Sequence, residues 1–207
     1  IYLKIILLLL VSASQAQVNA DFNVSNTNGC APFLVNFLDI SIGDVNTWSW
    51  DFGNGITSNK QNPTFIYSKP GFYTVTLTAN NSTSSDIEIK SSLIRVNAPP
   101  LPNFNVKKNK GCSPHTTQFK DLSIPQSGTI TKWYWAFGNG LTSTDQNPTS
   151  TFTEIKTYNT YLKVTDINGC EATLIKDSFI ELDGPKADFI YDSVICGLPA
   201  EVLFVFS

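Results

Sequence analysis

The chain has 207 residues, 15% of them charged, and a formal net charge of −3 at pH 7. No run of basic residues stands out, so nucleic acid is not an expected partner. The only histidine is His115, so a histidine-dependent catalytic site or a zinc site is not expected.

The first 16 residues are typical of a secretory signal peptide. Lys4 supplies the positive charge, residues 5–11 form an apolar stretch, and Ser14-Gln15-Ala16 is a small-residue cleavage site. The apolar stretch is too short to span a bilayer, and no later segment resembles a span. We therefore expect a secreted or cell-surface protein, of which this chain is the front part.

The chain repeats itself at a spacing of 85 residues. The run Trp48-Ser49-Trp50-Asp51-Phe52-Gly53-Asn54-Gly55 recurs as Trp133-Tyr134-Trp135-Ala136-Phe137-Gly138-Asn139-Gly140. A repeat of this length predicts one small domain per copy. We expect a first domain at 18–97, a proline-rich linker at 98–102, a second domain at 103–182, and the start of a third domain at 186–207.

Within each copy the hydrophobic pattern predicts strands. Large aromatic side chains alternate with polar ones, and the first Gly-Asn-Gly run supplies a tight turn. In the first copy we also expect strands near 20–25, 33–39, 63–68 and 86–96, and no amphipathic helix. The pattern predicts an all-β protein built of antiparallel β-sandwiches. The core positions that it indicates are Trp48, Trp50, Phe52, Tyr73, Trp133, Trp135, Phe137 and Tyr158.

These motifs resemble the polycystic kidney disease (PKD) domain family. The first copy carries the family's aromatic–glycine motif at 48–55 with Asn54 in place of Asp, followed by Pro70-Gly71-Phe72-Tyr73. The second copy departs further, with Ala136 at the Asp position and Lys156-Thr157-Tyr158 in place of Pro-Gly-x-Tyr. The resemblance implies tandem immunoglobulin-like sandwiches and a role in extracellular spacing or recognition rather than in chemistry.

Function follows mainly from this resemblance. We predict a non-catalytic spacer or adhesion array of a larger bacterial cell-surface protein, with no cofactor and no metal. Its expected partners are an extracellular protein or polysaccharide, and further repeats of the same chain. One alternative is the accessory region, spacing or substrate-targeting, of a secreted hydrolase. Another is a carbohydrate- or protein-binding module.

Few residues qualify as site candidates. Tyr134 and Tyr161 are expected to point outward from neighbouring strands and to form a candidate ligand platform, although a structural pair of exposed rings is the simpler interpretation. Asp51, before the glycine turn, is either a calcium ligand or a turn residue that bonds local N–H groups. His115 lies beside a turn and lacks the partners of a catalytic triad.

The cysteines indicate disulfides, as is typical of a secreted chain. Cys30, Cys112 and Cys196 occupy equivalent places in successive copies, whereas Cys170 has no counterpart in the first copy. In an immunoglobulin-like sandwich, Cys112 and Cys170 would lie at opposite ends of one domain. We therefore predict an inter-repeat bridge between Cys30 and Cys170, with an intra-repeat Cys112–Cys170 bridge as the alternative.

Overall fold

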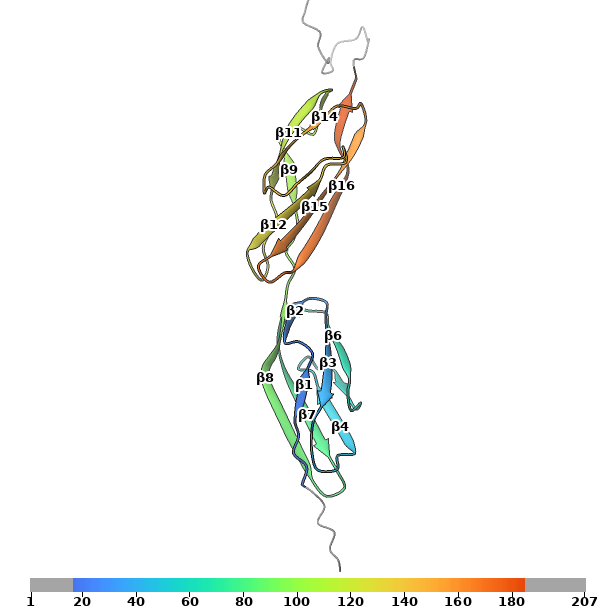
Figure 1. The fold of residues 1–207 in the computed structure, drawn as a ribbon, viewed down its shortest axis with the longest axis vertical. Helices are drawn as coiled ribbons and strands as arrows, with labels where there is room; N and C mark the ends of the chain where they lie inside the picture. Colours follow the sequence, from blue (N-terminus) through green and yellow to red (C-terminus); the bar gives the residue numbers. More distant parts are fainter. Residues whose placement is uncertain (1–16, 185–207) are drawn as a thin grey trace, which may run out of the picture. The chain divides into compact units, whose positions relative to one another are not determined.

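The computed structural model describes residues 17–184, so the predicted signal peptide at 1–16 and the predicted third domain at 186–207 lie outside the described residues. The chain divides between Val96 and Asn97 into two compact units, and each unit is a β-sandwich (Figure 1). Residues 17–184 contain strands but no helix, and hence no helix suited to crossing a membrane. The all-β, immunoglobulin-like prediction is confirmed.

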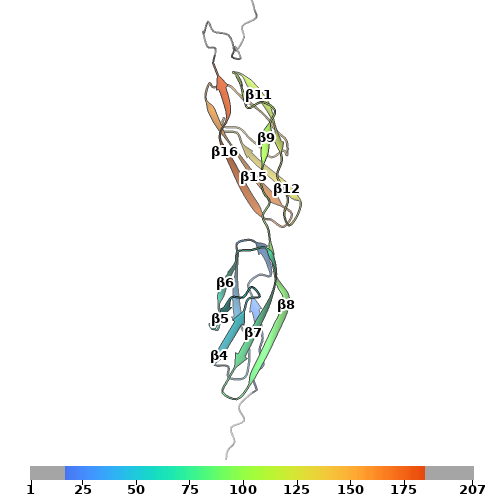
Figure 2. The same ribbon diagram turned by 180° about the vertical axis from the view of Figure 1, so that it is seen from behind.

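The first domain packs a three-stranded sheet against a five-stranded one (Figures 1 and 2). The small sheet has the order β1-β3-β6, and the large sheet has the order β2-β8-β7-β4-β5. The strands are β1 (Phe22–Val24), β2 (Asn28–Cys30), β3 (Phe33–Asp39), β4 (Thr47–Asp51), β5 (Thr57–Ser58), β6 (Thr64–Tyr67), β7 (Gly71–Asn80) and β8 (Ser85–Asn97).

The second domain repeats this topology strand for strand. Its small sheet has the order β14-β11-β9, and its large sheet has the order β10-β16-β15-β12-β13. The strands are β9 (Phe104–Val106), β10 (Lys110–Cys112), β11 (His115–Asp121), β12 (Ile130–Ala136), β13 (Thr142–Ser143), β14 (Thr149–Phe152), β15 (Thr157–Asp166) and β16 (Glu171–Asp183).

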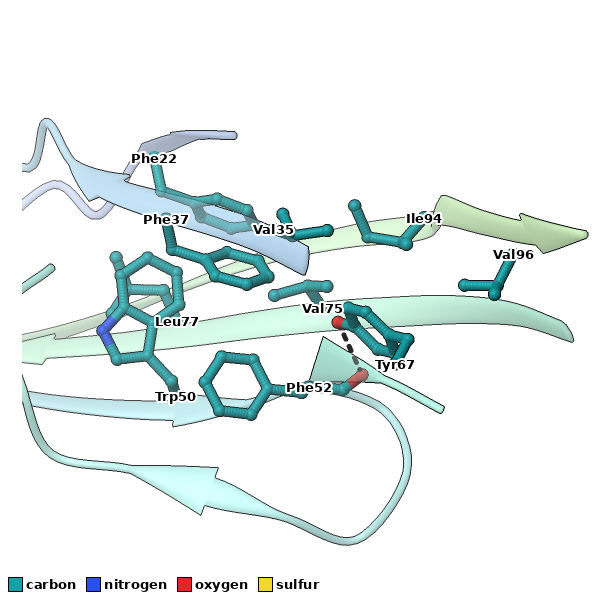
Figure 3. Close-up of a cluster of buried hydrophobic side chains, with 10 residues drawn as sticks. All are labelled: Phe22, Val35, Phe37, Trp50, Phe52, Tyr67, Val75, Leu77, Ile94 and Val96. Carbon is teal, nitrogen blue, oxygen red and sulfur yellow. Dashed lines mark hydrogen bonds between the residues drawn. The ribbon is translucent and has the colours of Figure 1, made fainter. Parts of the chain in front are cut away.

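The core of each domain lies between its two sheets, as the alternation predicts. Figure 3 shows the first core, in which the rings of Phe22, Phe37 and Trp50 pack together. Trp50 is completely buried, and so is its counterpart Trp135 in the second core. Tyr67 is also buried, its ring packs against Phe65 and Tyr73, and its hydroxyl donates to the carbonyl of Phe52 (Figure 3).

The predicted core residues fall into two groups. Trp50, Phe52, Trp135, Phe137 and Tyr158 are buried. Trp48, Trp133 and Tyr73 are only half-buried and pack against the core from its edge, because each carries a polar atom that must be satisfied. The indole N–H groups of Trp48 and Trp133 donate to Asp39 and Asp121, and the Tyr73 hydroxyl donates to the Lys69 carbonyl.

Two details differ from the sequence-based expectation. The short strands β2, β5, β10 and β13 were not expected, and β10 adds to the sheet edge in parallel with the end of β16. The predicted linker at 98–102 is also bonded into the second domain. Ala98 donates its N–H to the hydroxyl of Ser127, and Leu101 exchanges backbone hydrogen bonds with Ile124. The composition predicts a semi-rigid, extended segment here, but it does not indicate these hydrogen bonds to the second domain.

Candidate functional site

The outer face of the second domain's large sheet carries the candidate platform. On β12, β15 and β16 every second side chain points away from the core, since side chains alternate along a strand. The strand register therefore arranges nine outward residues in three rows of three. The rows are Lys132–Thr165–Glu171, Tyr134–Lys163–Thr173 and Ala136–Tyr161–Ile175.

Tyr134 and Tyr161 lie on diagonal positions of this grid and touch. Their ring centroids are 6.2 Å apart and the ring planes meet at 71°, which is an edge-to-face arrangement. Tyr134 keeps 41% of its surface exposed. The sequence-based prediction that the two rings are outward neighbours on adjacent strands is correct, and together the rings form an angled notch rather than a flat platform.

The notch opens into a shallow groove of about 560 Å³. The groove combines ring surface with hydroxyl and charged groups, which is the mixture that a binding site needs to hold and orient a ligand. Lys163 reaches both carboxylate oxygens of Glu171 at 3.3 Å, and the Thr165 hydroxyl donates to the same carboxylate. The other lining residues are Thr131, Lys132, Trp133 and Thr144.

The first domain has the same grid with different chemistry. Ser49 and Thr76 stand where the second domain has Tyr134 and Tyr161, and Ile89 matches Ile175. Its rows are Thr47–Asn80–Ser85, Ser49–Thr78–Ile87 and Asp51–Thr76–Ile89. The ring notch is therefore a property of the second domain and not of the shared scaffold.

The remaining sequence candidates have structural roles. Asp51 accepts a hydrogen bond from the Gly53 N–H at 2.8 Å, as a turn residue does. The His115 ring lies 3.1 Å from the Lys108 carbonyl, and no acidic partner contacts it within the described residues. Residues 17–184 also contain no cluster of three or more His, Cys, Asp or Glu side chains that could hold a metal ion.

Cys30, Cys112 and Cys170 are each part of a disulfide. The strand register argues against the alternative pairing of Cys112 with Cys170. Cys112 lies opposite Asp183 at the end of β16, whereas Cys170 precedes Glu171 at its start. Twelve residue steps of extended strand span roughly 40 Å, and a disulfide joins Cα atoms less than about 7 Å apart. The pairing of Cys30 with Cys170 stays a prediction.

Sequence reasoning did not anticipate the polar part of the groove. The pattern does not single out Lys132, Lys163 or Glu171, because isolated charged residues on strands are ordinarily solvated. Alternation along the strands is the signal that could have found them. Lys132 lies two residues from Tyr134 and Lys163 two residues from Tyr161, so both point outward with the rings. Glu171 is paired with Thr165, which lies four residues from Tyr161 and therefore also points outward.

Comparison with known proteins gives consistent matches. A sequence model of the family described as PKD domain matches residues 13–96 and 97–179. The chain is 30% identical over 135 residues to the pre-pro-metalloprotease PrtV of Vibrio cholerae serotype O1, which covers 65% of this chain and 14% of that protein. It is 48% identical over 40 residues to collagenase ColA of Bacillus cereus, covering 19% and 4% of the two chains. The chain thus spans a small part of the length of these relatives.

Among solved structures, the crystal structure of the PKD1 domain of the V. cholerae metalloprotease PrtV is similar. It is 30% identical and aligns with 41% of this chain and 98% of its own, with a TM-score of 0.36. The PKD1 domain of Vibrio anguillarum Epp is 26% identical, covers 42% of this chain and 99% of its own, and has a TM-score of 0.37.

Proposed function

Because the chain belongs to the PKD domain family, we propose that residues 17–184 form two non-catalytic modules that space and present other parts of a larger extracellular protein. One observation carries this proposal: the two domains share topology and core positions, while their outer faces differ in chemistry. A repeated scaffold with variable faces suits presentation and binding. The disulfide-bonded cysteines support export to an oxidising compartment.

A second candidate is an accessory region of a secreted protease. The similarity to a pre-pro-metalloprotease and to a collagenase favours it over a purely structural stalk. Sequencing the complete coding region separates the two. A protease domain in the same protein supports the accessory role, whereas further sandwich repeats with a surface anchor support the stalk.

The ring notch of the second domain supplies a recognition role in either setting. The test is retention of the chain on cellulose, chitin and gelatin beads. The first domain shows which residues the fold accepts at the ring positions, namely Ser49 and Thr76. The double variant Tyr134→Ser with Tyr161→Thr therefore removes both rings and keeps the fold. We expect retention on one of the three to fall roughly tenfold or more, since buried rings dominate binding free energy.

The reverse transfer completes the test. Ser49→Tyr with Thr76→Tyr, placed in the chain that lacks the second-domain rings, should restore part of the retention. If the original chain binds none of the three materials, the ring notch has no role in recognising them and the spacing role stands alone. If the double variant binds as the original does, the notch is not the site.

A further inference from the structure

A second groove lies on the other sheet of the second domain, along β9 and β11. Its volume is about 670 Å³, slightly larger than that of the ring-notch groove. Three of its lining residues are lysines and none is acidic. The lining comprises Asn105, Val106, Lys107, Lys108, Thr116, Thr117, Gln118, Phe119, Lys120, Leu122 and Asn147.

Backbone pairing brings the three lysines together from separate parts of the sequence. Lys107 and Lys108 follow the last residue of β9, and Lys120 lies opposite Asn105 on β11. The turn at Lys108 is held in place, because its carbonyl accepts a hydrogen bond from the Thr117 hydroxyl at 3.0 Å. The three ammonium groups therefore belong to one surface, which we call the lysine groove.

No carboxylate neutralises the lysine groove within the described residues. The ion pairs among residues 17–184 involve Lys90, Lys110, Lys156 and Lys163. None of them involves a lysine of the groove. Asp121 follows Lys120 in the sequence, but its carboxylate accepts hydrogen bonds from Trp133 and Gln146. Like charges held together without a counter-ion create a local positive potential that favours an anionic ligand.

The uncharged side chains that line the groove indicate which kind of anionic ligand it suits. Asn105, Thr116, Gln118 and Asn147 supply amides and a hydroxyl, which suit a ligand rich in hydroxyl groups. The only aromatic residue of the lining, Phe119, is fully buried, so no ring face is open to stack on a nucleobase. The combination matches a chain of sugars that carries carboxylate or sulfate groups.

We propose that the lysine groove binds an acidic polysaccharide. The first domain offers a natural contrast on the same scaffold, because Ser25, Asn26 and Leu38 stand at the positions of the three lysines. The corresponding face has no lysine at these positions and exposes apolar side chains instead, with Leu34, Leu38 and Ile66 each more than half exposed. The lysine groove lies on a different sheet from the ring notch. Whether it binds an acidic polysaccharide does not depend on the spacing role.

The test measures binding of the intact chain to polygalacturonate and dextran sulfate, with neutral dextran and a single-stranded oligothymidylate as comparison probes. We expect binding to both acidic polysaccharides, weakening as salt is raised because salt screens exposed charges. Lys107→Gln, Lys108→Gln and Lys120→Gln together should weaken it by at least about tenfold. A matched control, Lys60→Gln with Lys69→Gln and Arg95→Gln, removes three exposed charges from the first domain and should retain binding.

Three results would overturn the proposal. The first is equal weakening in the groove variant and the control, which would make the attraction one of overall charge. The second is equal binding of neutral dextran, which would remove the need for an anion. The third is tighter binding of the oligothymidylate than of either acidic polysaccharide. Thermal unfolding of both triple variants checks that the exposed substitutions leave the fold intact.

Discussion

The indole N–H of Trp48 donates to the Asp39 carboxylate across 2.7 Å. This bond ties the start of β4 in the large sheet to the end of β3 in the small sheet. Gln61 donates to the same carboxylate oxygen, at 3.1 Å. The second domain repeats the arrangement, with Trp133 donating to Asp121 at 2.8 Å. Gln61-Asn62-Pro63-Thr64 recurs as Gln146-Asn147-Pro148-Thr149, so in each copy one carboxylate links the tryptophan to the glutamine of this motif.

Trp48→Phe removes the donor while it keeps most of the ring packing. We expect the first domain to lose about 1.5–3 kcal/mol of unfolding free energy, the usual worth of a hydrogen bond to a charged group. Denaturant unfolding followed by tryptophan fluorescence measures the loss. Trp48→Phe combined with Asp39→Asn should cost less than the two single changes added together. Strict additivity would show that the bond contributes nothing.

Acid should weaken the first domain through the same carboxylate. Burial opposes ionisation of Asp39, but hydrogen bonds from Ser41, Gln61 and Trp48 outweigh it and hold its pKa below the ordinary 3.8. A carboxyl whose pKa is lowered by folding stabilises fully above 3.8, and this contribution disappears as pH falls through the folded value. Unfolding free energy measured from pH 6 downward should therefore drop below about pH 4. An Asp39→Asn variant should show a shallower drop, and an equal slope in both proteins would contradict the assignment.

The two glycines of the first Gly-Asn-Gly turn should respond differently to alanine. Both have positive φ, at 79° for Gly53 and 84° for Gly55. A Cβ on Gly53 would come within 2.3 Å of the Thr74 carbonyl oxygen, whereas one on Gly55 would meet open space. Gly55→Ala should cost about 1–2 kcal/mol of backbone strain. Gly53→Ala should cost about 2–4 kcal/mol, because the clash with backbone adds to that strain. Thermal or denaturant unfolding of the two variants should show this order, and equal costs would rule out the close contact.

An ion pair present in the first domain can be transplanted into the second. Lys90 contacts the Asp21 carboxylate at 2.8 Å and lies over the Phe22 ring, 4.5 Å from its centre. Lys176 occupies the same place over Phe104, where Asn103 replaces the aspartate, and burial lowers the pKa of its amine.

Asn103→Asp should therefore stabilise the second domain by about 0.2–1 kcal/mol, the range for partly exposed ion pairs. Asp21→Asn is the matched loss in the first domain, where the hydrogen bond from Lys90 holds the pKa of Asp21 below its ordinary value. Both differences should shrink in high salt. If Asn103→Asp leaves the midpoint of unfolding unchanged at low salt, the lysine gains nothing from a carboxylate partner.

The cysteine pairing calls for peptide mapping of the non-reduced protein. We expect a linked peptide containing Cys30 and Cys170, because Cys112 and Cys170 lie at opposite ends of β16. Cys170 is buried and follows a turn closed by Asp166, so its position is fixed within the second domain. Reduction should separate the two peptides. Recovery of Cys30 linked to Cys112 would refute the predicted pairing.

The sequence was sufficient to predict most of the strands and most of the core, because the local spacing of apolar residues determines which side chains are buried. Trp50 and Phe52 alternate with polar neighbours, and alternation by itself decides which face turns inward. The same rule predicted that Tyr134 and Tyr161 lie on the outer face. The rule also predicted full burial of Trp48 and Trp133, which are only half-buried. Hydrophobic patterning takes no account of the indole N–H, which here must reach a carboxylate. It also missed β2, whose three residues Asn28–Cys30 carry no strand signal of their own.

Repetition, alternation and glycine turns in the sequence thus determined the all-β class, the two domains and most of the core. Tertiary structure alone decided which polar residues meet. Lys107 joins Lys120 in one groove because β9 and β11 pair in a particular register. Trp48 meets Asp39 because two sheets close over a core. A sequence pattern records which side chains avoid water, whereas strand register and sheet packing determine which exposed groups lie close enough to act together.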